Sequence, residues 1–207
     1  MFDQSLRKIL AVSASDAPTP GGGSVSAMVG ALGAAMAAMV GNLTVGKPKY
    51  VEVEPEAKEI TAKAYYIINR LEKLAAADIA AFDKLMAAYR MPKNTEEEKA
   101  KKEEVLQKAL QTATNQPMEI ARTLLEAMVI TEQLSKIGNT MAISDAGVAA
   151  YVCEAALNAV LLSADINIPM VKDQEFVNAI IAEKNDLVAE AKRLKDLAVA
   201  TVQERMK

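Results

Sequence analysis

Apolar residues recur at steps of three and four over most of the chain, which is the spacing of one face of an α-helix. The clearest case lies within residues 56–91, where the pattern predicts a large apolar side chain at position 78 and the sequence has Asp78 instead. A carboxylate on a core-facing stripe costs free energy unless it is paired or takes part in chemistry. Asp78 is therefore either a structural acid, paired with a lysine or capping a neighbouring helix, or a functional group. The stripe around it consists of Ile60, Ile67, Leu71, Leu74, Phe82, Leu85 and Tyr89.

The same pattern predicts helices along the whole chain. No segment alternates apolar and polar residues as a strand does, and turn-forming glycines and prolines separate the helical stretches. Pro117 is placed where a new helix can begin. We expect one all-α domain over residues 1–207, a multihelical bundle of about six to eight helices. The predicted helices cover residues 2–12, 25–45, 56–91, 96–114, 117–137, 144–161 and 173–207.

Residues 25–45 form an uncharged segment crowded with glycine and alanine. Rows of small residues allow helices to approach closely, and about 20 apolar residues are also enough to span a membrane. The segment contains little leucine or isoleucine, and we find no second span for it to pack against. We therefore expect the central helix of the bundle, buried on all sides, and no membrane partner.

The composition limits which catalytic groups and metal sites the chain can have. The chain contains no histidine and a single cysteine, Cys153, so histidine triads, histidine or thiolate metal sites and intrachain disulfides are excluded. Proton transfer must come from carboxylates, lysines, tyrosines or the substrate, and we expect no metal. Cys153 lies among small apolar residues and is expected to be an inert core residue.

The net charge of −3 gives no reason to expect a nucleic-acid partner. The N-terminal residues lack the features of a signal peptide, and the cysteine usage fits a reduced, cytoplasmic location.

Two loop segments are candidates for ligand binding. A glycine run precedes the 25–45 helix, and backbone N–H groups at a helix N-terminus can bind an anion or a carbonyl oxygen; the alternative is a tight turn between packed helices. A basic turn follows that helix, and it is either a solvated turn or a site for a polyanionic substrate tail. The glycine run consists of Gly21, Gly22, Gly23 and Ser24, and the basic turn contains Lys47 and Lys49.

A third candidate is the turn at Asn139, Ser144 and Asp145. Ser144 is better placed as a helix N-cap than as a nucleophile, because no histidine is present to activate it. Asp145 is favoured in the first turn of a helix by the helix dipole. Both side chains could nevertheless face a ligand.

These motifs together resemble the tetrahydrofolate cyclodeaminase/cyclohydrolase family. They occur in the order typical of that family and cover nearly the whole chain. The segments that carry the resemblance are Pro20–Ser24, Asn42–Lys47, Asp78-Ile79-Ala80-Ala81-Phe82, Met91–Lys99, Gly138-Asn139, Ser144-Asp145 and Asp165-Ile166-Asn167.

The resemblance implies an all-α homodimer that binds a tetrahydrofolate derivative near the subunit interface, with no cofactor beyond that substrate. It assigns proton acceptance to Asp78. The implied activity is closure of 5-formimidoyltetrahydrofolate to 5,10-methenyltetrahydrofolate with release of ammonia. One alternative is a methenyltetrahydrofolate cyclohydrolase that uses the same site, and a second is a non-catalytic folate-binding dimer. The glycine run, with Asn139, Ser144 and Asp145, would orient the pterin and amidine, and Lys47 and Lys49 would meet the glutamate tail.

Overall fold

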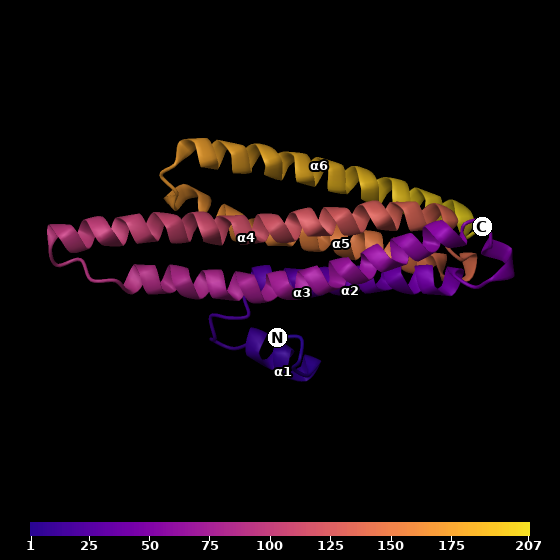
Figure 1. Cartoon of the computed structure of the whole chain (residues 1–207), viewed down its shortest axis with the longest axis horizontal. Helices are drawn as coiled ribbons and strands as arrows, with labels where there is room; N and C mark the ends of the chain where they lie inside the picture. Colours follow the sequence, from indigo (N-terminus) through magenta and orange to yellow (C-terminus); the bar gives the residue numbers. More distant parts are fainter.

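The computed structural model describes all 207 residues, and every regular element in it is helical, which confirms the predicted all-α class (Figure 1). Five long helices, α2 to α6, run side by side in an elongated bundle, and the short helix α1 lies beside it. The elements are α1 (Leu6–Ser13), α2 (Gly22–Thr44), α3 (Glu54–Arg90), α4 (Glu96–Ile137), α5 (Ile143–Asp165) and α6 (Gln174–Arg205), with single-turn 3₁₀ helices η1 (Pro48–Tyr50), η2 (Thr140–Ala142) and η3 (Ile168–Met170).

Helix α2 packs against three neighbouring helices and contacts each of them at a glycine. A Cβ atom at Gly30 would lie 2.1 Å from a methyl carbon of Leu124 in α4. One at Gly33 would lie 2.6 Å from the sulfur of Cys153 in α5, and one at Gly41 would lie 2.1 Å from the hydroxyl of Thr61 in α3. Only glycine allows the helices to come this close, which explains the small-residue composition of α2.

Helix α2 is not buried on all sides, contrary to the prediction. Val29, Leu32 and Leu43 are exposed along one of its faces. The sequence pattern could not reveal this face, because its residues are as apolar as those of the buried faces.

Helix α4 runs without interruption through Pro117, so the predicted break between residues 114 and 117 is wrong. Pro117 has no N–H to donate to the carbonyl of Ala113, but Asn167 donates its side-chain Nδ2 to that oxygen at 3.2 Å. Leu110 before the proline and Met118 after it are both fully buried, so packing on each side holds the helix in line.

Helices α2 and α5 each start earlier than predicted, and the predicted N-cap Ser144 is not a cap. Helix α2 starts at Gly22 with Gly21 as its N-cap, so Ser24 lies inside the first turn. Helix α5 starts at Ile143, directly after η2, so Ser144 lies within its first turn as well. Gly22 and Gly23 take helical geometry directly after the extended Gly21, and α5 begins directly after the last residue of η2.

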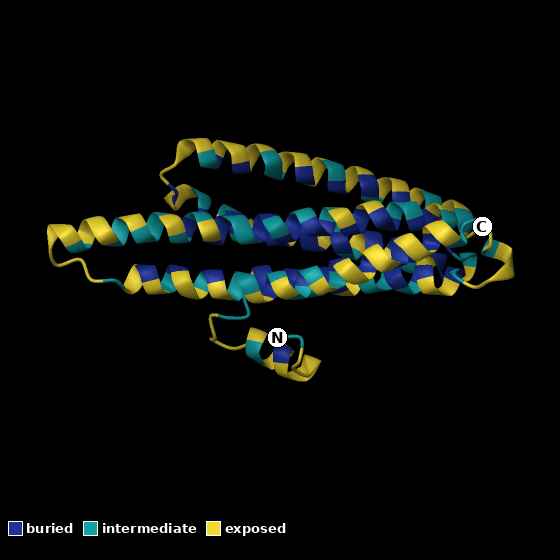
Figure 2. Ribbon diagram, viewed as in Figure 1, coloured by how far each residue is buried: buried dark blue, intermediate teal, exposed yellow.

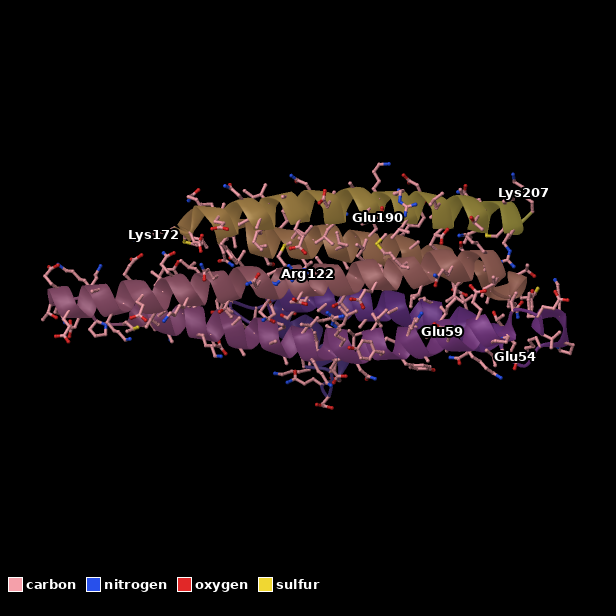
Figure 3. All side chains as sticks on the ribbon, turned by 45° about the horizontal axis from the view of Figure 1, so that its top comes forward. Glu54, Glu59, Arg122, Lys172, Glu190 and Lys207 are labelled. Carbon is pink, nitrogen blue, oxygen red and sulfur yellow. The ribbon has the colours of Figure 1, made fainter.

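Burial follows the helix faces. Figure 2 shows buried residues where the long helices meet and exposed residues on their outer sides, at α1 and at the tip of the α3–α4 hairpin. Charged side chains such as Glu59, Arg122 and Glu190 lie along the outer surface (Figure 3). Arg122 forms an ion pair with Glu183 that links α4 to α6.

Two segments are long and apolar enough to cross a membrane, Gly22–Thr44 and Thr140–Met170, so the expectation of no second candidate span is wrong. In the structure these segments are core helices, with 61% and 50% of the respective windows buried inside the bundle. Core helices of this kind meet the same length and composition criteria, so the two segments are weak evidence for a membrane.

Candidate active site

Asp78 projects from the middle of α3 onto the N-terminus of α2. A Cβ atom at Gly23 would lie 2.6 Å from each carboxylate oxygen of Asp78, so the carboxylate rests directly on the Gly23 backbone. The backbone N–H of Ser24 donates a hydrogen bond to the same carboxylate. The first N–H groups of a helix have no partners within the helix, and the positive end of its dipole favours an anion. The sequence therefore places glycine where the helix terminus must meet the acid.

The surroundings of Asp78 raise its pKa above the usual value of 3.8. Burial is the main cause, because it penalises the charged form, and the hydrogen bond from Ser24 acts in the opposite direction. None of the ion pairs in the structure includes Asp78, so the acid is not paired with a lysine. It does cap α2, as one structural alternative requires, and the pocket in front of it supports the functional interpretation.

The carboxylate opens into a pocket of about 310 Å³ between α2, α3, α4 and the end of α5. The pocket extends along α3 from Asp78 to Tyr89, a helix length of about 16 Å at 1.5 Å per residue. Asp78 is the only charged residue of the lining, and no lysine or arginine is present. The apolar side chains of the lining include Ile79, Phe82, Leu85, Met86, Ile166 and Met170, and its other polar residues include Thr19, Ser163 and Asn167.

The glycine run of the sequence lies at this pocket. Gly21, Gly22 and Gly23 line it beside Asp78, and Ser24 is fully buried behind them. The hydroxyl of Ser24 donates to the carbonyl oxygen of Gly21 at 3.2 Å, so only its backbone N–H serves the carboxylate.

The remaining predicted site residues lie at the opposite end of α2, which is about 33 Å long at 1.5 Å per residue. Lys47 and Lys49 are exposed around η1. Asn139 fastens the C-terminal end of α2, since its backbone N–H donates to Thr44 Oγ1 and its Nδ2 donates to the carbonyl of Leu43, both at 2.8 Å. Within one chain, this group does not meet Asp78. It also includes Ser144 and Asp145 in the first turn of α5.

The pocket lining contains no cysteine. Cys153 is fully buried between α5 and α2, and burial raises the pKa of its thiol to about 12, which keeps it protonated. This fits the expectation of an inert core cysteine.

Sequence reasoning did not assign Ser163 or Asn167 to the site. Both lie near the C-terminal end of α5. Asn167 belongs to the Asp165-Ile166-Asn167 segment that carries the family resemblance, but an asparagine two residues before Pro169 is also ordinary at a helix end. Only the fold shows that this helix end closes the pocket opposite Asp78.

Comparison with known proteins supports the motif-based resemblance. The family model described as formiminotransferase-cyclodeaminase matches residues 5–186. The chain belongs to the formiminotransferase-cyclodeaminase family. The resemblance seen in the sequence is thereby confirmed.

Relatives in this family carry two activities in their names. A methenyltetrahydrofolate cyclohydrolase of Methylorubrum extorquens is 40% identical over 204 residues, covering 99% of this chain and 98% of the relative. The formimidoyltransferase-cyclodeaminase of Rattus norvegicus is 30% identical, and the chain spans 38% of that longer protein. The crystal structure of a formiminotetrahydrofolate cyclodeaminase from Thermotoga maritima superposes with a TM-score of 0.88 at 30% identity, covering 98% of each chain.

The contact between Gly23 and Asp78 predicts a selective effect of substitution. In Gly23→Ala the new methyl group must displace the carboxylate, whereas in Gly22→Ala the Cβ lies 3.6 Å from Ser163 Oγ, an ordinary contact. Both changes add helix propensity, roughly 1 kcal/mol. We expect both variants to fold and Gly23→Ala to lose at least roughly tenfold more folate turnover than Gly22→Ala, because a small misplacement of a catalytic group is costly. Thermal unfolding and steady-state kinetics measure the two effects, and equal turnover in both variants would contradict the assigned contact.

Proposed function

We propose that this chain is a methenyltetrahydrofolate cyclohydrolase in which Asp78 is the general base. The observation that carries the proposal is a single carboxylate of raised pKa in an otherwise uncharged pocket. The named activity of the M. extorquens relative, which matches over the whole of both chains, supports it. The motif resemblance favoured the cyclodeaminase activity, which we keep as the second candidate.

The charge of the pocket suits the substrate. The reacting N5–C–N10 unit of 5,10-methenyltetrahydrofolate is an amidinium cation, and a pocket whose only charge is a carboxylate attracts it. Phe82 and the other apolar side chains of the lining offer surface for the flat pterin and phenyl rings.

In the proposed reaction, water attacks the methenyl carbon while the Asp78 carboxylate takes one of its protons. A new C–O bond forms and the cation becomes a neutral tetrahedral adduct. The protonated Asp78 then gives its proton to N5 as the C–N5 bond breaks, and the hydroxyl proton leaves to solvent as the formyl C=O forms. The products are 10-formyltetrahydrofolate and one proton, and no cofactor takes part.

The second candidate is the cyclodeaminase reaction, supported by the whole-chain likeness to the T. maritima structure. There N10 of 5-formimidoyltetrahydrofolate attacks the carbon of the protonated amidine, which becomes an –NH2 group, and Asp78 takes the N10 proton. The same proton then passes to the departing nitrogen, which leaves as ammonia. One carboxylate serves both steps, so the absence of histidine is no obstacle.

The kinetics of the Asp78→Asn variant and the pH dependence of kcat/KM test whether Asp78 is the base. The base must be ionised, and its pKa is raised by burial, so kcat/KM should fall as the pH drops through a pKa above 3.8 and level off at higher pH. Asp78→Asn should fold, lose roughly 100- to 10,000-fold in kcat and show no acid limb.

The assay follows the methenyl chromophore with each folate: decay indicates the cyclohydrolase, and formation with ammonia release indicates the cyclodeaminase. Near-normal rates in Asp78→Asn would rule out Asp78 as the base. Binding of folate by the wild-type protein without turnover of either substrate would favour the non-catalytic alternative.

We further propose that the protein is a homodimer that buries the exposed apolar residues of α2 and α5. The two helices are antiparallel neighbours, and several of their apolar side chains are exposed in the single chain: Val29, Leu32 and Leu43 on α2, Val148, Tyr151 and Leu162 on α5, and Ile166 directly after α5. Exposed apolar side chains in such number are typical of protein interfaces. Ile166 also lines the pocket, so the pocket opens next to this surface.

A two-fold axis perpendicular to α2 within this surface would place opposite ends of the two α2 helices side by side. Lys47 and Lys49 of one subunit would then approach the pocket that contains Asp78 of the other. This arrangement would reunite the predicted tail-binding lysines with the proposed base and complete the site.

Complementation tests the shared site. We expect a mass of twice the 22.1 kDa chain by light scattering. Asp78→Asn and the double variant Lys47→Glu, Lys49→Glu should each be impaired with a polyglutamate substrate at low concentration. The co-expressed mixture should recover roughly a quarter of wild-type activity, because half of the dimers are heterodimers and each of these holds one intact site out of two. Activity no higher than the mean of the two variants would contradict sharing of the site.

A further inference from the structure

Asn167 is a buried polar residue of the pocket to which the proposed reaction has given no role. Its residue exposure is 8%, and its Nδ2 donates to the carbonyl of Ala113 at 3.2 Å and to that of Ser163 at 3.1 Å. Both partners are carbonyl oxygens, which can only accept. The orientation of the amide is therefore fixed, with its nitrogen toward α4 and α5 and its oxygen on the opposite side.

The proline in α4 contributes to this orientation. Pro117 has no N–H, so the Ala113 carbonyl lacks its usual partner four residues on and is available to Asn167. A proline in the middle of a 42-residue helix normally costs stability, and here it leaves an acceptor at the wall of the pocket.

The Oδ1 atom of Asn167 has no donor within the chain. Asn167 Oδ1 is not among the fully enclosed side-chain atoms that lack a hydrogen-bond partner, so it reaches accessible space. Since Asn167 lines the pocket, that space is the pocket.

Asn167 and Asp78 stand at the same level of the pocket. Helices α3 and α4 run antiparallel, with Arg70 paired to Glu119 and Glu126 on one side of this level and Lys102 bonded to the carbonyl of Tyr89 on the other. Counted along the helices between these anchor points, Ala113 of α4 lies at about the level of Asp78 of α3, and Asn167, which is bonded to Ala113, lies at that level too. The pocket thus presents two acceptors, one able to take a proton and one able only to accept a hydrogen bond.

We propose that Asn167 is a second catalytic residue, whose Oδ1 accepts a hydrogen bond from the water molecule that Asp78 deprotonates. This inference rests on the proposed cyclohydrolase function. Water has two O–H groups: Asp78 takes one proton, and the other O–H donates to Asn167 Oδ1, which turns an oxygen lone pair toward the methenyl carbon. Asn167 itself gains and loses no proton, so the balance of the reaction is unchanged.

The test compares Asn167→Ala with Asn158→Ala. Asn158 lies within α5 and is a matched control: like Asn167, its Nδ2 donates to the carbonyl four residues earlier, here that of Glu154, and it does not line the pocket. We expect Asn167→Ala to lower kcat about 10- to 100-fold, the equivalent of one hydrogen bond to a reacting group. KM for the methenyl substrate should change less than about threefold, and the acid limb due to Asp78 should keep its pKa. Asn158→Ala should retain wild-type kinetics.

A second variant tests how Asn167 is held. Pro117→Ala supplies an N–H to the Ala113 carbonyl, which competes with Asn167 Nδ2, so kcat should fall in the wild-type background and change little further in Asn167→Ala. Independent, additive effects of the two substitutions would overturn the link between them.

The outcomes separate this inference from the function on which it rests. Wild-type kcat in a folded Asn167→Ala, or a rise in KM with kcat unchanged, would overturn the role of Asn167 and leave the cyclohydrolase function intact. Loss of activity with a collapsed unfolding transition would mark Asn167 as structural and would likewise overturn its catalytic role. Absence of methenyl hydrolysis in the wild-type protein would overturn both proposals.

Discussion

The close packing of α2 against its three neighbours is the constraint on which the rest of the structure depends. Glycine at positions 30, 33 and 41 lets α4, α5 and α3 approach the α2 backbone, and each approach would be blocked by a single methyl group. Close-packed interiors tolerate little change in volume, so the three contacts fix where α2 lies along its length. The N-terminus of α2 is thereby held in one place relative to α3, and this is where Asp78 meets it.

Two opposing effects act on the pKa of the Asp78 carboxylate at that meeting point. Burial raises its pKa and costs stability at neutral pH, while the Ser24 N–H and the positive end of α2 favour its charged form. A carboxylate whose pKa is raised is a stronger base than an ordinary surface aspartate. The apolar walls that desolvate the carboxylate also offer surface for aromatic rings. A buried carboxylate among apolar side chains is unfavourable in a protein core, but it suits a reaction on a folate.

Much of the fold was predictable because helical periodicity is strong in this chain, and the misplaced acid at Asp78 was visible from the same pattern. The sequence also predicted that the small residues of α2 allow neighbouring helices to approach closely. Pro117 misled the prediction because a local rule ends a helix at proline, whereas a side chain distant in sequence, Asn167, compensates for the missing bond. Asn167 was missed as a site residue for the same reason, since its role depends on which helices meet at the end of α5. The sequence could not predict that Lys47 and Asp78 lie at opposite ends of α2, because spacing along a sequence does not say which helix ends come together.

The most direct test of the central claim is a crystal structure of the Asp78→Asn variant with 5,10-methenyltetrahydrofolate bound. The account predicts that the methenyl carbon lies in the pocket between α2, α3 and α5, with room for one water molecule between it and residue 78. That water should lie within roughly 3 Å of the side chains of residue 78 and Asn167. A folate bound elsewhere on the bundle, or bound in the pocket with its methenyl carbon facing away from residue 78, would contradict the account.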